Sequence, residues 1–137
     1  MFRAFILSVI IFWLSSCVPS QNTFIADIKA QTWNDKAQVS YANGDTMSIK
    51  DISLTVRYTS MLKDSLLGVE VKVEDPEGYY IIDSLMLETP ATREHFAQST
   101  MMYRTGNRFR SSGDYTFTIS PLQRGVKGVT AVGITIH

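Results

Sequence analysis

The stretch that decides the fold is Met47-Ser48-Ile49-Lys50-Asp51-Ile52-Ser53-Leu54-Thr55-Val56-Arg57-Tyr58-Thr59, in which apolar and polar side chains alternate. Successive side chains of an extended strand point to opposite faces of the sheet. One face therefore carries Ile52, Leu54, Val56 and Tyr58, and the other carries Ser53, Thr55 and Arg57. This alternation is typical of a strand with one face in a hydrophobic core and the other toward solvent.

The same alternation recurs along the chain. Residues 67–74 (LGVEVKVE), 115–119 (YTFTI) and 132–136 (VGITI) repeat it with β-branched and aromatic residues, which suit a pleated sheet. No window carries an apolar stripe of helical spacing, and residues 89–96 are the least strand-like, with room for one helical turn. We therefore predict about eight strands, at residues 24–33, 36–42, 47–59, 66–75, 79–88, 97–105, 113–120 and 129–136.

Clusters of turn-forming residues separate these strands. They are Asn43-Gly44-Asp45, Asp75-Pro76-Glu77-Gly78, Thr105-Gly106-Asn107 and Ser112-Gly113-Asp114. Asn-Gly supplies the positive φ of tight hairpins, and Pro-Glu-Gly suits a β-turn. Short strands at this spacing predict an all-β fold, a single antiparallel β-sandwich of immunoglobulin-like or jelly-roll type, with the strand order left open.

The N-terminal segment is typical of a bacterial lipoprotein signal peptide. Arg3 supplies a positive charge, residues 4–13 are apolar except for one serine, and Leu14-Ser15-Ser16-Cys17 resembles a lipobox. In such a segment the cysteine thiol is acylated and the chain is cut just before it. The apolar run is shorter than the roughly 20 residues that cross a bilayer, which disfavours a permanent transmembrane helix. An ordinary secreted protein with an incidental cysteine is the other alternative.

These features predict the domain organisation and the location. We expect a cleaved signal peptide at residues 1–16, a tether at residues 17–23 lipidated on Cys17, and a sandwich domain at residues 24–137. The tether has no acidic run of the kind that resembles a surface-export signal. The expected location is therefore the bacterial cell envelope, on the outer membrane and facing the periplasm.

Charge and cysteine content exclude several classes of partner. The chain has 13 basic and 13 acidic side chains, which gives no electrostatic attraction to nucleic acid and no polybasic lipid-binding cluster. Cys17 is the single cysteine, so its acylation leaves no disulfide, thiol nucleophile or thiolate ligand. Attachment to the membrane is expected through the acyl chains.

Catalytic and metal-binding patterns are weak. His95 and His137 are the only histidines, and the acidic residues of 74–77 lack the spacing of a calcium loop. No Gly-x-Ser-x-Gly elbow is present, and two carboxylates could be nominated almost anywhere. We therefore expect no enzyme, no cofactor, no metal site and no small-molecule ligand.

A few residues are candidates for contact with a partner. Arg104, Arg108 and Arg110 form the only local basic cluster, which indicates either a site for anionic glycans or lipid head groups or arginines on a hairpin rim. Trp33 is either a stacking surface or a core residue. Tyr79 and Tyr80 are neighbours in an expected strand, so one ring should be exposed.

The C-terminal quarter resembles a known family. Residues 108–124 and 129–136 place Gly113, Tyr115, Phe117, Arg124, Gly133 and Ile136 where the GldH-type gliding-motility lipoproteins of Bacteroidota have corresponding residues. The resemblance implies an envelope lipoprotein of the motility and secretion machinery, or of envelope assembly, without catalytic residues. The family's Trp- and Gly-rich central loop is replaced here by Tyr79-Tyr80-Ile81-Ile82-Asp83.

Structural roles can be predicted for three of the matched residues. Gly113 should permit the turn into its strand, and Gly133 should mark a close backbone approach or a bulge. Arg124 is expected to hold a loop through hydrogen bonds to carbonyl groups.

The sequence is consistent with two functions. The first is a lipid-anchored, non-catalytic protein that acts by protein–protein contact, as a GldH-like component. The second is a ligand- or glycan-binding lipoprotein that stacks sugars on Trp33, Tyr79 or Tyr80. Burial of these rings, or a concave surface beside them, discriminates between the two.

Overall fold

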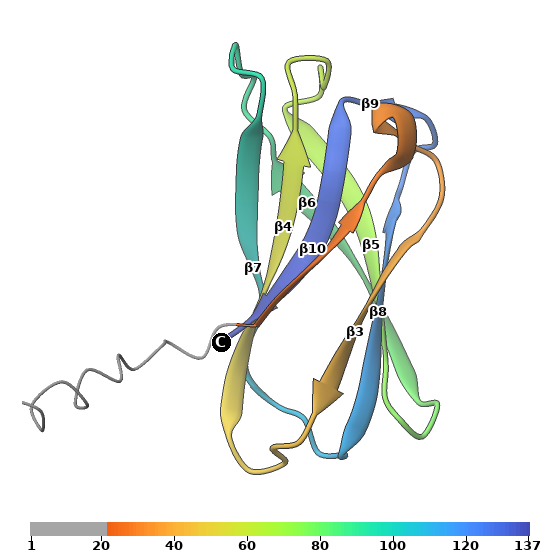
Figure 1. Cartoon of the computed structure of the whole chain (residues 1–137), viewed down its shortest axis with the longest axis vertical. Coiled ribbons are helices and arrows are strands. Elements are labelled where there is room, and N and C mark those ends of the chain that lie inside the picture. The colour runs from red at the N-terminus through yellow and green to blue at the C-terminus, as the bar shows by residue number, and fades with distance from the viewer. Residues whose placement is uncertain (1–21) are drawn as a thin grey trace, which may run out of the picture.

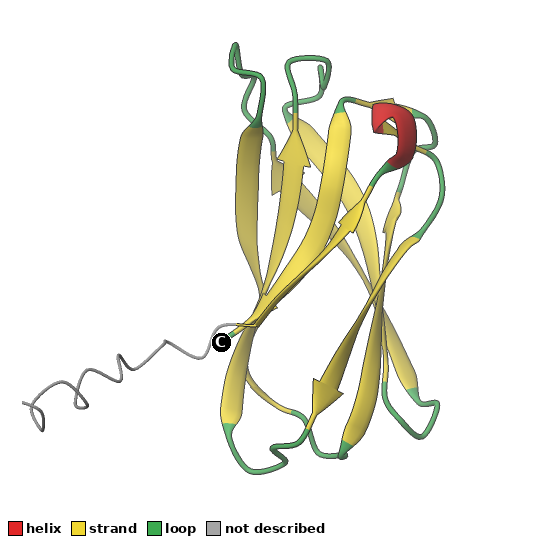
Figure 2. Cartoon of the chain, viewed as in Figure 1, coloured by secondary structure: helices red, strands yellow, loops and turns green. Residues whose placement is uncertain are grey.

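The computed structural model describes residues 22–137, so the expected signal peptide, Cys17 and most of the expected tether lie outside the described part of the chain. The described residues form an antiparallel β-sandwich (Figures 1 and 2), which confirms the predicted fold class. The elements in chain order are β1 (Asn22–Asp27), η1 (a 3-10 helix, Lys29–Gln31), β2 (Thr32–Trp33), β3 (Ala37–Asn43), β4 (Ile49–Tyr58), β5 (Leu66–Glu74), β6 (Tyr80–Glu88), β7 (Ala97–Arg108), β8 (Gly113–Pro121), β9 (Val126–Lys127) and β10 (Val129–Ile136).

Two four-stranded sheets face each other across the core. One has the order β1-β10-β4-β7, the other has the order β3-β8-β5-β6, and β2 pairs with β9 beside them. The β5–β6 hairpin joins neighbours within one sheet, whereas β3 to β4 and β6 to β7 cross between the sheets. The strand order that the sequence left open is therefore defined.

The inward faces of both sheets form one hydrophobic core, as the alternation predicts. Leu54 and Val56 of β4 are fully buried, as are Val71 of β5 and Phe117 and Ile119 of β8. Ser53 and Thr55 are also buried, although they belong to the polar face of β4. They lie on a central strand between β10 and β7, and Thr55 shares a hydrogen bond of 3.2 Å with Thr100.

Three local predictions are wrong. The expected strand 24–33 is interrupted by η1, because Ala30 and Gln31 adopt positive φ of 54° and 50°. Residues 89–96 contain no helical turn. The expected turn at Thr105-Gly106-Asn107 lies inside β7, where Gly106 has a positive φ of 62°. There it accompanies an irregular register with β4 and not a chain reversal.

The predictions for Gly113 and Gly133 are confirmed, and the prediction for Arg124 is wrong. Gly113 has a φ of 124° at the start of β8, and a Cβ on Gly133 would lie 2.2 Å from the backbone oxygen of Phe24. Gly133 therefore permits the close approach of β1 to β10, as predicted. Arg124 is exposed, and among the described residues its side chain forms no hydrogen bond to a carbonyl group.

The sandwich is closed differently along its two long edges. At one edge of the sandwich β1 packs against β3. There the rings of Phe24 and Tyr41 form a T-shaped pair whose centroids lie 5.8 Å apart. At the other edge β6 and β7 belong to opposite sheets and do not pair. That second edge brings together most of the residues that the sequence marked as contact candidates.

Candidate functional site

A clamp of polar side chains joins the edge strands β6 and β7, which do not pair with each other. The Tyr103 hydroxyl and an Arg104 guanidinium nitrogen of β7 both donate to the same carboxylate oxygen of Asp83 on β6, at 2.6 Å and 2.8 Å. The hydrogen bond from Tyr103, and then that from Arg104, lower the pKa of Asp83 below its ordinary value. Burial, reinforced by the hydrogen bond to Asp83, raises the pKa of Tyr103 to about 12.

A bulge in β7 explains how neighbouring residues reach one carboxylate. Ile52 of β4 lies opposite Arg104, whereas the next residue, Ser53, lies opposite Met102, so Tyr103 is an extra residue on β7. In a regular strand Tyr103 and Arg104 would point to opposite faces, and a bulge re-aims one of them. The irregular register therefore builds the clamp.

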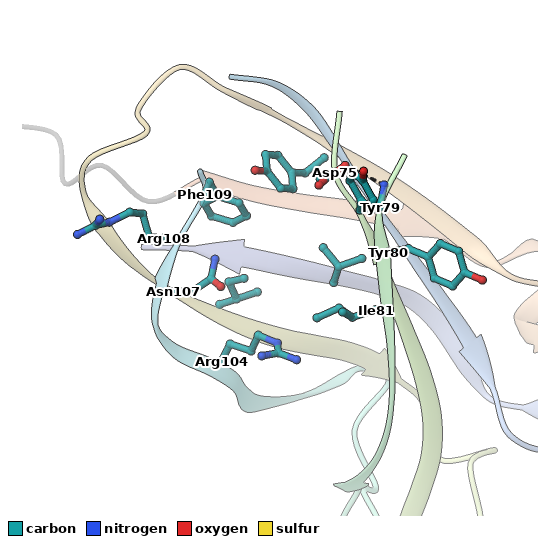
Figure 3. Close-up of a pocket in the computed structure, with 11 residues that line it drawn as sticks. Asp75, Tyr79, Tyr80, Ile81, Arg104, Asn107, Arg108 and Phe109 are labelled. Atoms are coloured by element: carbon teal, nitrogen blue, oxygen red, sulfur yellow. Dashed lines mark hydrogen bonds between the residues drawn. The ribbon is translucent and has the colours of Figure 1, made fainter. Parts of the chain in front are cut away.

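A cleft opens beside the clamp, between the start of β6 and the end of β7 (Figure 3). Its volume is about 210 Å³. Its floor consists of core side chains, and its rim is polar and aromatic. The floor comprises Ile52, Val73, Phe109 and Tyr115, and the rim comprises Asp75, Tyr79, Tyr80, Arg104, Asn107 and Arg108, with Ile81 between them.

The exposure of the side chains on the inward face of β6 shows where the cleft opens. Leu87, near the end of the strand, has no exposed surface, whereas Ile81 on the same face is 46% exposed. Figure 3 shows the Ile81 side chain on the cleft side of β6, whereas the Tyr80 ring points to the opposite side of the strand. The two sheets therefore separate toward the start of β6, and the core becomes accessible there.

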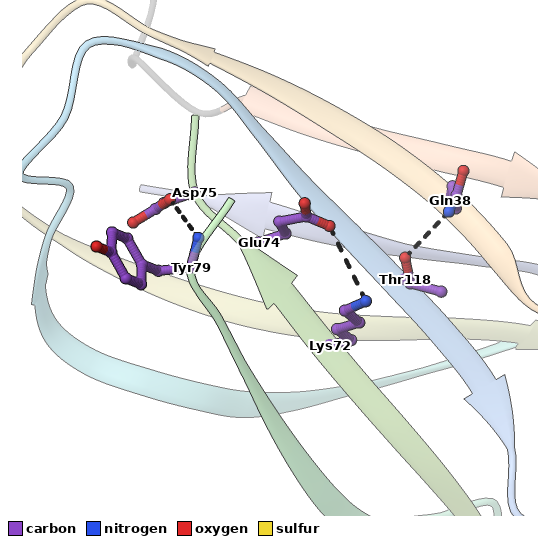
Figure 4. Close-up of polar contacts among 6 residues, drawn as sticks. All are labelled: Gln38, Lys72, Glu74, Asp75, Tyr79 and Thr118. Atoms are coloured by element: carbon purple, nitrogen blue, oxygen red, sulfur yellow. Dashed lines mark hydrogen bonds and ion pairs between the residues drawn. The ribbon is translucent and has the colours of Figure 1, made fainter. Parts of the chain in front are cut away.

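The β5–β6 turn holds the backbone of Tyr79 in place. The Asp75 carboxylate accepts hydrogen bonds from the backbone N–H groups of Glu77 and Tyr79, both at 2.9 Å (Figure 4 shows the second). Tyr79 lies just before β6 and is 73% exposed, and Tyr80 is 58% exposed. Both rings are exposed, and not only one as predicted.

The structure brings together some of the predicted contact residues and separates others. Tyr79, Tyr80, Arg104 and Arg108 line the cleft. Trp33 is only 1% exposed and belongs to the core, so it offers no stacking surface. Arg110 is exposed in the loop after β7, outside the cleft lining.

The residues that complete the site were not singled out from the sequence. Asp83 carried a signal, because period two places its charge on the apolar inward face of an expected strand. A charge there is a known feature of edge strands. Tyr103 and Asn107 carried none, since their positions depend on the bulge and on Gly106.

Neither a membrane-spanning helix nor a cluster of metal-binding side chains occurs among residues 22–137. Within that range no helix is long and apolar enough to cross a bilayer. No group of three or more histidine, cysteine or acidic side chains is arranged to hold a metal ion there.

Comparison with known proteins gives little. No family model and no curated protein matches the chain. One solved structure, titled "Structure of infectious bursal disease virus Gx strain", aligns with a TM-score of 0.39 and 12% identity. The alignment covers 86% of this chain and 32% of the viral chain. A likeness at this level indicates no shared function.

Proposed function

We propose that this protein is a lipid-anchored, non-catalytic component of the bacterial cell envelope that acts by protein–protein contact along the β6 edge. The observation that carries the proposal is an exposed apolar strip that begins at the cleft and follows the outer face of β6, with one interruption at Ser84. The strip comprises Tyr80, Ile82 and Met86 of β6, Leu66 of β5, and Leu122 after β8, each about half exposed. Exposed apolar side chains gathered on one face with a polar surround are typical of protein interaction sites.

The rest of the same sheet face is polar, so the strip has a definite border. Gln38 donates a hydrogen bond of 3.3 Å to Thr118, and Lys72 lies 4.0 Å from Glu74 (Figure 4). The Lys72 ammonium also lies 4.4 Å from the centre of the Tyr80 ring, at the boundary between the two regions. A partner that covers the β6 side would leave the β3 and β8 side in solvent.

The anchor is proposed from the lipobox ending at Cys17. Cys17 precedes the first described strand residue, Asn22, by a short segment whose full extension spans about 17 Å. Acyl chains on Cys17 would thus keep the sandwich close to the membrane surface. The resemblance to GldH-type lipoproteins favours motility and secretion machinery, or envelope assembly, as the setting.

Copurification tests the proposal with a matched pair of variants. Ile82→Glu places a charge in the apolar strip, and Gln38→Glu places the same charge on the polar part of the same sheet. Full-length lipidated protein is extracted from its membranes after mild cross-linking. We expect one or more envelope proteins to be recovered with the native chain and with Gln38→Glu, and to be lost with Ile82→Glu. Equal recovery with both variants would argue against contact at β6.

Glycan binding is the second candidate, because Tyr79 and Tyr80 are exposed beside a concave surface. The cleft volume of about 210 Å³ is below the roughly 300–1,000 Å³ of typical small-molecule pockets. It suits a single inserted side chain better than a sugar unit with its neighbours. A glycan array probed with the native chain and with Tyr79→Ala would support this candidate if specific binding were lost in the variant.

A further inference from the structure

The cleft is continuous with an open strand edge. Among residues 22–137, β6 pairs with β5 alone, so no described strand pairs with the backbone groups on its other side. The Asp83 clamp crosses that side in the middle of β6. Before the clamp, Tyr80, Ile81 and Ile82 are all about half exposed. An unpaired edge of this kind offers N–H and C=O groups to an extended peptide.

The part of the edge before Asp83 lacks the residues that usually prevent such pairing, whereas the inward-pointing charge of Asp83 protects the strand from there on. Residues 80–82 contain no proline and no charged side chain. The side chain of an added strand that faced inward would enter the cleft beside Ile81. The cleft floor at that point is apolar, with Val73 and Phe109 among its residues. The geometry therefore suits an aliphatic or aromatic anchor.

A free positive charge beside the cleft indicates the charge of the partner. Arg104 is engaged by Asp83, and the Asp75 carboxylate is engaged by the backbone of its own turn. Arg108 lies at the edge of the cleft with its side chain directed outward (Figure 3), is exposed, and forms no ion pair with any residue of 22–137. A carboxylate is the natural complement of a free guanidinium group.

Resting on the proposed function, we infer that the partner presents an extended acidic segment. It pairs with β6 at Tyr80–Ile82, inserts one aliphatic or aromatic side chain into the cleft, and places a carboxylate within two residues of that anchor against Arg108.

Selection from a library of random seven-residue peptides displayed on phage tests this chemistry. The full chain, extracted from membranes and immobilised in lipid nanodiscs, is used with Arg108→Glu and Lys36→Glu in parallel. Lys36 is exposed just before β3, at the end of that strand away from Asn43, and its substitution makes the same change of charge. Circular dichroism and a thermal melt confirm that each variant is folded.

We expect the native chain and Lys36→Glu to enrich peptides with an apolar anchor and an Asp or Glu within two positions of it. Arg108→Glu should retain those peptides roughly fivefold less well, as expected for an exposed ion pair, and should select Lys or Arg at the acidic position. Enrichment without an acidic preference, the same preference in Arg108→Glu, or no enrichment would overturn the inference.

Self-association is a distinct outcome. If light scattering shows a dimer of the native chain that Ile82→Glu dissociates, the edge is occupied by a second copy and the acidic-segment inference is wrong. The copurification experiment is independent of this selection, because an envelope partner can be lost with Ile82→Glu whatever peptides are enriched.

Discussion

Replacing Asp83 by alanine should open the β6–β7 edge and lower the stability of the sandwich. The substitution leaves the Tyr103 hydroxyl and the Arg104 guanidinium without the carboxylate that both contact, at 2.6 Å and 2.8 Å. A hydrogen bond to a charged group contributes about 1.5–3 kcal/mol when buried and less when exposed. The Asp83 and Arg104 side chains are 36% and 39% exposed. We therefore expect a loss of about 2 kcal/mol in the free energy of unfolding.

Urea denaturation followed by circular dichroism measures this loss, and the melting temperature should fall by roughly 8 °C. Glu88→Ala is the matched control, since Glu88 is an exposed acidic residue on the same strand, and it should change stability by less than about 0.5 kcal/mol. Combining Asp83→Ala with Tyr103→Phe should cost about 1 kcal/mol less than the sum of the single losses. Strict additivity, or an Asp83→Ala loss equal to the control, would refute the role of the clamp.

The same clamp makes the stability depend on pH in acid. Both hydrogen bonds favour the ionised carboxylate, so the pKa of Asp83 is lower in the folded protein than in the unfolded chain. Its contribution is therefore fully present above the ordinary carboxyl pKa of about 3.9 and is lost as pH falls through the lower folded pKa. The Asp83→Ala variant should lack this acid dependence.

Three further predictions follow from the fold and the anchor. Gly133→Ala should cost about 3 kcal/mol in urea unfolding, because the new Cβ would meet the Phe24 backbone oxygen at 2.2 Å. Gly44→Ala, with no atom within 4 Å of its Cβ, serves as its control. The pKa of Tyr103 is raised to about 12, so stability should fall between pH 10 and pH 12, by up to about 1 kcal/mol after solvent screening. A Tyr103→Phe variant should lose that part of the alkaline dependence in the same assay. Cys17→Ser should abolish labelling by a radioactive fatty acid and change processing while leaving a folded sandwich; normal cleavage and membrane attachment in this variant would contradict the lipoprotein assignment.

The strands could be predicted from the sequence because each one buries a single face. Period-two alternation in 47–59 and 115–119 follows directly from that requirement, and β4 and β8 lie there. The interruption of 24–33 could not be predicted in this way. It depends on Ala30 and Gln31 adopting positive φ, which their residue types do not signal.

The candidate site was only partly predictable for a similar reason. Tyr79 and Tyr80 are candidates as aromatic neighbours in an expected strand, and Arg108 is one as part of a basic cluster, but nothing local says that they share a cleft. The cleft exists because β6 and β7 lie at the same edge of the sandwich but in opposite sheets. The two strands separate on the N-terminal side of Asp83 in β6. Long-range pairing of this kind, and the bulge at Tyr103, arise from tertiary structure and not from periodicity.

The central claim is that the β6 edge is the surface through which this protein meets a protein partner. A photoreactive amino acid placed at Ile81 in the full lipidated chain tests it in intact cells, with the same group at Lys36 as the control. We predict an adduct of discrete mass with another envelope protein from position 81 and none from position 36. No adduct at position 81, or the same adducts from both positions, would contradict the account.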